Sequence, residues 1–329
     1  MTSLAEKIQN AWQQQSKWLV LLRPLSWLYR GVFLMQKNAK QKSAYRAPVP
    51  VMIIGNITVG GSGKTPLIIS LVKYLQAQNI KVGVISRGYG GQGDFPALVT
   101  KSSLASQVGD EPTLIVQQTQ VPMAVGPNRQ QSIELLLEHH DIDLILSDDG
   151  LQHFALQRDL EWVVVDAMRG FGNKKLLPEG YLREPLARLD DVTVIEHHHV
   201  PKTALNMHLE PSQPFCLADT ARVFDPVATY QAVVGIGYPQ RFFNTLDQMN
   251  IAFEPHTFPD HHQYTLQDLD ALLGQPIITT AKDAVKLQEL LHQHPQYLQN
   301  IWVVPVEAKL SDSCYAVLNQ QLSALNLFL

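Results

Sequence analysis

The stretch VMIIGNITVGGSGKTPLIISLV, residues 51–72, decides the fold of this chain. Its first five residues form a continuous apolar run, which predicts a buried strand over 51–55. The glycine-rich segment GGSGKT follows at 60–65, and the apolar periodicity of 66–76 predicts a helix directly after it. A strand, a glycine-rich turn and a helix in this order are the context that a phosphate-binding loop requires.

The residue types in this loop suit the binding of a nucleotide. Glycines allow consecutive backbone N–H groups to point at phosphate oxygens. Lys64 is expected to reach the β- and γ-phosphate oxygens of ATP, and the Thr65 hydroxyl is expected to ligate Mg²⁺. The predicted nucleotide-binding residues are Thr58, Val59, Gly60, Gly61, Ser62, Gly63, Lys64 and Thr65.

The loop departs from the common pattern G-x-x-x-x-G-K-[ST], because Thr58 stands where that pattern has its first glycine. Gly60 and Gly61 resemble instead the deviant loop of ATPases that carry GGxGKT. The lysine that those proteins often place before the glycines is Val59 here. A glycine turn without a nucleotide is the alternative interpretation, and the agreement of strand, loop and helix favours the phosphate loop.

A second segment supplies the acidic partner that a nucleotide site needs. The apolar run of IDLILSDDG, residues 142–150, predicts a strand that ends in Asp148 and Asp149. Carboxylates at this place are expected to hold Mg²⁺ directly or through water. Paired aspartates at a strand end can also cap the next helix. With GKT upstream, we favour the metal role, because ligands of parallel sheets bind at the carboxyl ends of the strands.

The remaining pattern predicts an α/β fold with two domains. Short apolar runs at 51–55, 82–86, 121–126, 142–147, 162–166 and 192–196 alternate with helical segments, which predicts a parallel sheet flanked by helices. A second, smaller α/β set follows, with strands at 232–237, 276–280 and 301–306. The expected domains are a basic arm over 1–46, a P-loop nucleotide-binding domain over 47–210 and a smaller C-terminal domain over 211–329.

Composition narrows the function further. The chain has 329 residues, a net charge of −4 and two cysteines. That length exceeds what one core usually supports, which agrees with two domains. Two cysteines cannot build a disulfide framework, so a reducing cytosolic compartment is the simplest interpretation. The near-neutral balance argues against nucleic-acid binding, and the sequence indicates no obligate protein partner.

Charge is uneven along the chain. Residues 1–46 carry eight Lys and Arg against a single Glu, and they include the aromatic segment KWLVLLRPLSWLYRGVFLM at 17–35. Arg23, Pro24 and Arg30 interrupt its apolar runs, which are too short to span a bilayer. A secretory signal peptide also fits poorly. The pattern favours an amphipathic segment lying in an anionic membrane interface. A helix packed on the protein's own core is the alternative.

Several further motifs resemble one family. They are SRGYGG (86–91), VGDEP (108–112), DDGLQH (148–153), FGNKKLLPEGYLRE (171–184), GIGYPQRFF (235–243), FPDHHQY (258–264) and TTAKDAVK (279–286). In this order around GNITVGGSGKTP they resemble tetraacyldisaccharide 4'-kinase, the lipid A 4'-kinase. The deviant phosphate loop also resembles that family's own form. The resemblance extends from the N-terminal arm to about residue 310.

The resemblance implies an activity and a place. The activity is transfer of the ATP γ-phosphoryl group to the 4'-hydroxyl of a tetraacylated glucosamine disaccharide 1-phosphate. The expected place is the cytoplasmic face of the inner membrane, where the protein would be peripheral. By the same resemblance Asp110 and His261 are the catalytic pair that activates the acceptor hydroxyl. Asp148 and Asp149 serve the metal. The residues expected to line the site are Arg87, Arg129, Arg183 and Glu184.

The expected roles of the other polar motifs are less specific. Asp110 belongs to the predicted first domain and His261 to the second, so this mechanism implies that the two domains close. Lys282 and Asp283 either reach the cleft between the domains or pair at the start of a helix. The run His197, His198 and His199 is expected on the solvated surface, because adjacent histidines need not converge on a metal.

A regulatory or partitioning ATPase of the GGxGKT class is the competing function. Such a protein would hydrolyse ATP to switch a partner, and proteins of this class also use amphipathic membrane helices. The segments LPEGYLRE and FPDHHQY argue for the kinase, since a simple switch does not require them.

Overall fold

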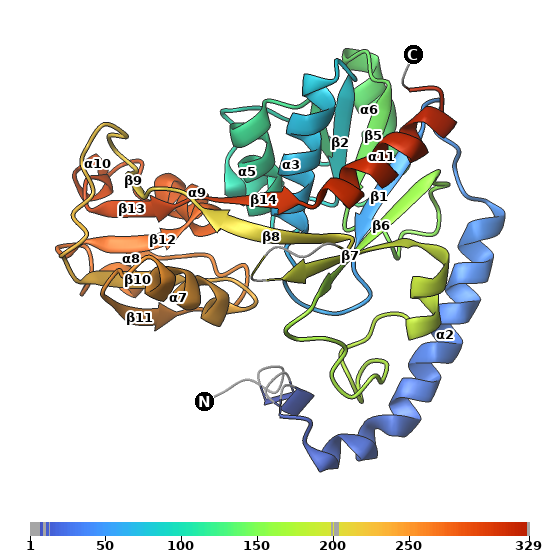
Figure 1. The fold of residues 1–329 in the computed structure, drawn as a ribbon, viewed down its shortest axis with the longest axis horizontal. Coiled ribbons are helices and arrows are strands. Elements are labelled where there is room, and N and C mark those ends of the chain that lie inside the picture. Colours follow the sequence, from blue (N-terminus) through green and yellow to red (C-terminus); the bar gives the residue numbers. More distant parts are fainter. Residues whose placement is uncertain (1–6, 9–10, 13, 199, 201–203, 328–329) are drawn as a thin grey trace. The chain divides into compact units, whose positions relative to one another are not determined.

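The computed structural model describes residues 7–8, 11–12, 14–198, 200 and 204–327. By its internal contacts the chain divides into two compact units (Figure 1). The first unit comprises the residues up to Lys64, then 142–208 and 310 onward. The second comprises 65–141 and 209–309. Both units are therefore built from separate stretches of chain. The expected domain bounds of 1–46, 47–210 and 211–329 follow the order of the sequence instead, and they stay a prediction.

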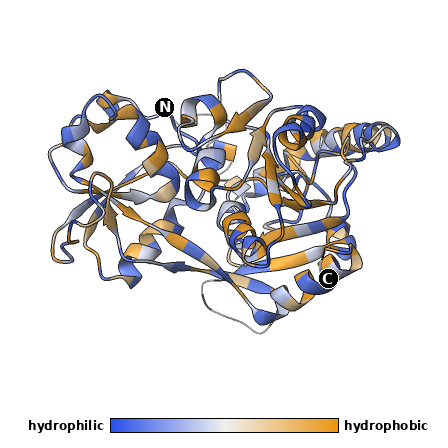
Figure 2. Ribbon diagram, turned by 90° about the horizontal axis from the view of Figure 1, so that it is seen from above, coloured by the Kyte–Doolittle hydropathy of each residue, from blue (hydrophilic) through white to orange (hydrophobic). Residues whose placement is uncertain are grey.

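Strands of the first unit belong to a large, mostly parallel sheet. The strands are β1 (Val51–Gly55), β5 (Leu144–Asp148), β6 (Leu160–Asp166), β7 (Thr193–His198) and the start of β8 (Asn206–Pro211). They lie in the order β8-β7-β6-β1-β5, and each neighbouring pair is parallel. All five residues of β1 and of β5 are buried. The apolar sequence of β1 predicts this, whereas β5 also buries the polar residues Ser147 and Asp148 at its end. The hydrophobic colouring of the strands is visible in Figure 2.

Helices of the first unit come from both ends of the described chain and from its middle. They are η1 (Lys17–Leu22), α2 (Arg23–Lys42), η2 (Leu186–Asp191) and α11 (Asp312–Ala324). Helix α11 packs on the sheet, where Nε1 of Trp162 donates a hydrogen bond to Oε1 of Gln321 at 2.8 Å. Among the described residues, none of the helices combines the length and the apolar character that crossing a bilayer requires.

The second unit also mixes helices and strands. Strands β2 (Val82–Ser86), β4 (Met123–Val125) and β3 (Ala97–Val99) lie side by side in that order, with β3 antiparallel to β4. The helices near them are α3 (Lys64–Ala77), α4 (Ala105–Val108), α5 (Asp110–Thr119) and α6 (Arg129–His139). Asn128 caps α6, because its side chain accepts hydrogen bonds from the backbone of Gln130 and Gln131.

A five-stranded sheet completes the second unit. Its order is β11-β10-β12-β13-β9, with all pairs parallel except β13 and β9. The strands are β9 (Phe215–Cys216), β10 (Tyr230–Val234), β11 (Phe253–Thr257), β12 (Ile277–Thr280) and β13 (Ile301–Val304). The other elements are α7 (Pro239–Gln248), α8 (Leu266–Leu269), α9 (Ala281–Leu290), α10 (Pro295–Leu298) and β14 (Val306–Leu310). Apolar cores cover both faces of this sheet. Helix α9 packs against α5, which brings two distant parts of the sequence together.

Candidate active site

The phosphate loop connects β1 to α3, as the sequence predicts. Helix α3 begins at Lys64, so the glycine-rich segment leads directly into a helix N-terminus, where backbone N–H groups and the helix dipole favour anions. Gly60 and Gly63 have φ angles of 100° and 96°, in the region that favours glycine. A Cβ atom on Gly63 would come within 2.8 Å of Nδ1 of His197 and of Cε of Met207. A side chain at position 63 would therefore strain the backbone and displace His197 and Met207.

His197 supports the phosphate loop from β7. Its side chain is buried, and its Nδ1 lies 2.9 Å from the carbonyl oxygen of Ser62. A carbonyl oxygen only accepts, so Nδ1 donates this hydrogen bond. The expectation that the histidine run lies on the solvated surface is therefore wrong for His197. His197 is the penultimate residue of β7, where it is buried like Ile195 two positions earlier, while Glu196 between them is exposed. His199 lies outside the described residues.

The segment 181–183 runs beside the same loop. The backbone N–H of Val59 donates to the carbonyl of Tyr181 at 2.9 Å, and Thr58 forms an antiparallel bridge with Leu182. The guanidinium of Arg169 lies over the Tyr181 ring and donates to the carbonyl oxygen of Val59 at 3.3 Å. The LPEGYLRE motif thus fixes the backbone of the phosphate loop. Arg169 and His197 are the supports that sequence reasoning missed.

Asp149 forms an ion cluster at the carboxyl end of β5. Both terminal nitrogens of Arg183 donate to its carboxylate at 2.8 and 3.1 Å, and Nζ of Lys64 lies 3.4 Å from Oδ1. Burial would raise the pKa of Asp149, but the charges of Lys64 and Arg183 outweigh it and hold that pKa well below its usual range. Asp149 is therefore ionised at neutral pH, and it orients the lysine of the phosphate loop.

The neighbouring Asp148 is the last residue of β5, and only 1% of it is exposed. Within the described residues, no group of three or more His, Cys, Asp or Glu side chains is arranged to hold a metal ion. Mg²⁺ in nucleotide sites usually takes one or two carboxylates together with phosphate oxygens and water. The two carboxylates Asp148 and Asp149 at one strand end fit such an ion.

The buried carboxyl group of Glu184, the residue after Arg183, lies beside this ion cluster. Nε2 of Gln152 donates to Oε1 of Glu184 at 2.8 Å and to the carbonyl of Asn56 at 3.1 Å. Burial raises the pKa of Glu184, and the hydrogen bond from Gln152 and the charge of Arg188 only partly oppose that rise. Arg183 also donates to the Asn56 carbonyl at 3.1 Å. Arg183 and Glu184 are thus both tied to the turn that follows β1.

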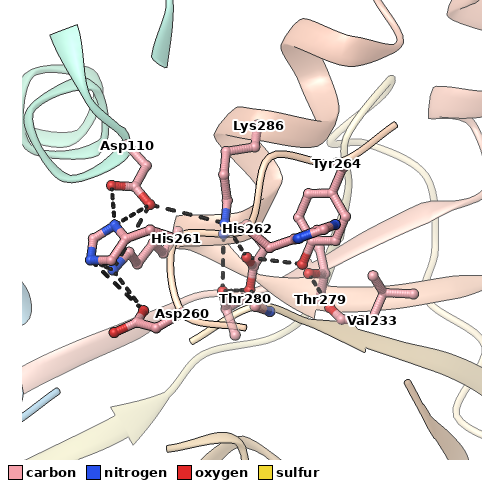
Figure 3. Close-up of polar contacts among 12 residues, drawn as sticks. Asp110, Val233, Asp260, His261, His262, Tyr264, Thr279, Thr280 and Lys286 are labelled. Atoms are coloured by element: carbon pink, nitrogen blue, oxygen red, sulfur yellow. Dashed lines mark hydrogen bonds and ion pairs between the residues drawn. The ribbon is translucent and has the colours of Figure 1, made fainter. Parts of the chain in front are cut away.

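Asp110 and His261 meet within the second unit (Figure 3). Asp110 is the first residue of α5 and is buried, and His261 lies in the loop after β11. Nδ1 of His261 is 3.1 Å from each carboxylate oxygen of Asp110. The sequence argument expected these residues to meet through the closing of two domains. In the structure they are already in contact inside one compact unit.

Charged neighbours set the protonation of this pair. Burial would raise the pKa of Asp110, but the hydrogen bond from His261 and the charges of Lys282 and Lys286 bring it below its usual value. Burial lowers the pKa of His261, yet the hydrogen bond to Asp110 and the charges of Asp110 and Asp260 leave it raised. Asp110 is therefore a carboxylate at neutral pH.

Comparison with known proteins identifies the family. The family model described as tetraacyldisaccharide-1-P 4'-kinase matches residues 18–323. The chain belongs to this kinase family. A relative named tetraacyldisaccharide 4'-kinase from Psychrobacter cryohalolentis is 50% identical, over 97% of this chain and 96% of its own length. Another of that name, from Actinobacillus pleuropneumoniae, is 46% identical, over 94% and 97% respectively.

A solved structure supports the same assignment. It is described as LpxK from Aquifex aeolicus in complex with ATP, and it aligns with a TM-score of 0.76 at 25% identity. The alignment covers 93% of this chain and 99% of that one. The resemblance to the lipid A 4'-kinase family and the predicted α/β class, with a parallel sheet flanked by helices, are both confirmed. The regulatory ATPase is not favoured.

The other predicted residues of this kinase family member lie as follows. Thr65 is the second residue of α3. Arg87 directly follows β2, and its side chain is exposed. Arg129 begins α6, where it is buried and donates to the carbonyl of Gly126 at 2.7 Å. Asp283 accepts a hydrogen bond from Thr280 at the start of α9 and pairs with Lys286, while Lys282 reaches the Asp110 and His261 pair within the second unit.

Proposed function

We propose that this protein transfers the γ-phosphoryl group of ATP to the 4'-hydroxyl of tetraacyldisaccharide 1-phosphate, in lipid A biosynthesis. Membership of the kinase family supports the reaction, as do the names of relatives that cover nearly the whole chain. The ATP complex of the Aquifex aeolicus relative supports the nucleotide. The single observation that carries the chemistry is the buried Asp110 carboxylate in contact with His261.

The phosphate loop is assigned to ATP. The backbone of residues 58–63 and the ammonium of Lys64 would hold the phosphates, with Asp149 and Arg183 fixing the lysine. Thr65 and one or both of Asp148 and Asp149 would hold Mg²⁺, which neutralises phosphate charge in reactions of this class. His197 keeps the loop in its binding conformation through Ser62.

Asp110 is assigned to the acceptor hydroxyl. The 4'-oxygen attacks the γ-phosphorus, the bond from that phosphorus to the β,γ-bridging oxygen breaks, and ADP leaves. The hydroxyl proton passes to the Asp110 carboxylate, which is ionised at neutral pH. His261 positions that carboxylate by donating a hydrogen bond from Nδ1. Arg87, Arg129, Arg183 and Glu184 are proposed as lining residues for substrate or phosphate groups.

The N-terminal arm is assigned to a membrane surface. One face of α2 packs against the rest of the first unit: Arg23 forms an ion pair with Glu179 at 2.9 Å, and Tyr29 donates to the Arg183 carbonyl at 2.9 Å. Leu19 of the arm is buried, but many of its other apolar side chains are exposed, including Leu21, Trp27 and Met35 at 76%, 68% and 74%. A basic segment with exposed aromatic and aliphatic side chains suits an anionic lipid interface. This supports a peripheral position on the cytoplasmic face of the inner membrane.

Vesicle binding tests the arm. Deleting residues 1–40 should weaken partitioning to anionic vesicles and reduce lipid phosphorylation. Replacing Trp27 and Met35 by Ser should weaken partitioning without removing the Arg23 ion pair, so it separates lipid contact from packing on the first unit. Unchanged partitioning in both variants would refute the interfacial assignment.

Transfer of labelled phosphate tests the reaction. The wild-type chain is incubated with Mg²⁺, γ-labelled ATP and tetraacyldisaccharide 1-phosphate. The kinase places the label on the lipid in proportion to the ADP formed. Label that appears only as free phosphate, with none on the lipid, would favour the regulatory ATPase instead. A Lys64→Met variant should lose both products, which confirms that the activity belongs to this phosphate loop.

A further inference from the structure

Lys282 occupies the centre of a cluster of acidic groups near the Asp110 and His261 pair. Its Nζ lies 3.1 Å from Oε1 of Glu111, 3.5 Å from Asp260 and 3.9 Å from Asp110. The same nitrogen is 3.3 Å from Nε2 of His261. Burial lowers the pKa of Lys282, but these carboxylates outweigh burial and raise it above its usual range. Lys282 is therefore protonated, and its ammonium lies within hydrogen-bond distance of Nε2, the second ring nitrogen of His261.

Hydrogen-bond chemistry then decides the protonation state of His261. The Asp110 carboxylate only accepts, so Nδ1 carries a proton and donates to it. An ammonium only donates, so a bond between Lys282 and Nε2 requires a lone pair on Nε2. Burial lowers the pKa of His261, but Asp110 and Asp260 leave it raised, which favours the imidazolium. The two hydrogen bonds oppose this, because both are satisfied together only by the neutral imidazole protonated at Nδ1. An imidazolium would direct its Nε2–H at the ammonium, so that two positive donors would face each other.

This contact bears on which group takes the hydroxyl proton. In a triad of the Ser-His-Asp type, a carboxylate holds Nδ1–H and the free Nε2 acts as the base. Here the ammonium of Lys282 lies at Nε2, which makes that nitrogen a poor proton acceptor. We propose that Lys282 is a positioning residue that keeps His261 neutral and protonated at Nδ1, so that Asp110 and not the imidazole accepts the proton. The proposal rests on the assigned kinase reaction.

Other groups facing the pair have different contacts. Lys286 is 4.0 Å from Asp110, but its ammonium pairs with Asp283 at 2.7 Å and lies over the Tyr264 ring. Asp260 is 3.8 Å from Nε2 of His261, and the Tyr89 ring meets the imidazole edge-on with the centroids 4.8 Å apart. Glu111 forms an ion pair with Lys282, and Lys282 in turn contacts the Asp110 and His261 pair. Of these groups, Lys282 is the donor that lies on Nε2.

Removing this ammonium has a defined effect on protonation. Lys282 lowers the pKa values of both Asp110 and His261. A Lys282→Met variant should therefore have both raised, which moves the acid limb of the kcat profile upward by about one pH unit. It should also increase the imidazolium fraction of His261 at neutral pH. Lys282→Arg keeps the charge and should retain the wild-type behaviour.

The test is a ¹⁵N NMR measurement on histidine-labelled protein, together with the pH profile of kcat. Wild type and Lys282→Arg should show the His261 shifts of a neutral ring protonated at Nδ1 at pH 7.5, whereas Lys282→Met should show shifts toward imidazolium. Lys309→Met is the matched control, because Lys309 forms a partly exposed ion pair with Glu307 in the same unit. It should leave the spectrum and the profile unchanged.

Two outcomes would overturn the proposal. One is an imidazolium or an Nε2-protonated ring at His261 in the wild type at pH 7.5. The other is a Lys282→Met variant with wild-type shifts and an unmoved acid limb. If Lys282→Met does not fold, the double variant Lys282→Met with Glu111→Gln removes the lysine and its nearest carboxylate together, and it is judged by the same readouts. The NMR result does not depend on turnover, whereas failure of label transfer by the wild type would refute the kinase assignment itself.

Discussion

The phosphate loop and the Asp110 pair are built in different ways. The loop uses backbone groups from one continuous segment, residues 58–64, and side chains such as His197 support it from outside. The pair uses side chains from α5, from the loop after β11 and from α9, which lie far apart in the sequence. Because of this difference, side-chain substitutions should have different effects in the two regions. Side-chain changes should abolish the chemistry at the pair, whereas changes to the side chains that support the loop from outside should weaken nucleotide binding.

The largest expected effect is at Asp110. Asp110→Asn keeps the shape and an acceptor for Nδ1–H of His261 but cannot take the hydroxyl proton. The kcat should fall by about 10²- to 10⁴-fold, as for the loss of a general base. The KM for ATP should stay within about twofold, because the phosphate loop is untouched. Steady-state kinetics with varied ATP measure both constants.

A second Asp–His contact of the same unit provides the control. Asp268 lies 3.1 Å from Nε2 of His262, and its carboxylate accepts a hydrogen bond from the backbone N–H of Thr265, the N-cap of the short helix α8. Asp268→Asn should leave kcat near the wild-type value. An Asp110→Asn enzyme with full turnover would remove Asp110 from the mechanism. An equal loss in the Asp268→Asn variant would show that the effect comes from folding.

An intermediate effect is expected at His197. His197→Phe removes the buried hydrogen bond to the Ser62 carbonyl, and the loss of one such bond weakens binding by about tenfold. The KM for ATP should rise by that factor, while the KM for the lipid should not change. His198→Phe is the control, because His198 contacts Glu196 and not the loop. Equal ATP affinity in wild type and His197→Phe would show that the loop holds its conformation without this support.

The smallest expected effect concerns stability. The contributions of Asp149 and His261 to the free energy of unfolding should change in opposite directions with pH. The folded pKa of Asp149 is depressed, so its stabilising contribution is present above the unfolded value of about 4 and is lost at lower pH. The folded pKa of His261 is raised, so its contribution is present below the unfolded value of about 6.5 and is lost as pH rises through the folded pKa. Each contribution should be about 1 kcal/mol or less.

Urea unfolding of matched variants measures this difference. The free energy of unfolding that Asp149→Asn loses relative to wild type should shrink as pH falls from 5 to 3. The corresponding loss for His261→Asn should shrink as pH rises from 6 to 9. Parallel trends for the two variants would contradict the opposite shifts of the two groups.

The sequence predicted the phosphate loop, which is formed by adjacent residues, better than the surroundings of Asp110, which depend on packing. GGSGKT after an apolar run predicts a strand, loop and helix from residues that are adjacent in the chain. The support from His197 could not be predicted in this way, because it depends on the register of β7 beside the loop. The pairing of Asp110 with His261 followed from family resemblance. The place of Lys282 required the packing of α9 against α5.

The C-terminal segment from residue 310 onward belongs to the first unit, and this affects how the chain folds while the ribosome synthesises it. Helix α11 packs on the sheet through Gln321, which binds Trp162 on β6 and Thr193 on β7. The strands it covers are translated more than a hundred residues earlier. At about 5–20 residues per second, these strands wait several seconds or more for the helix that covers them. During that interval the nascent chain exposes apolar sheet surface, so a chaperone that binds extended apolar segments on the ribosome should engage this protein before residue 312 emerges.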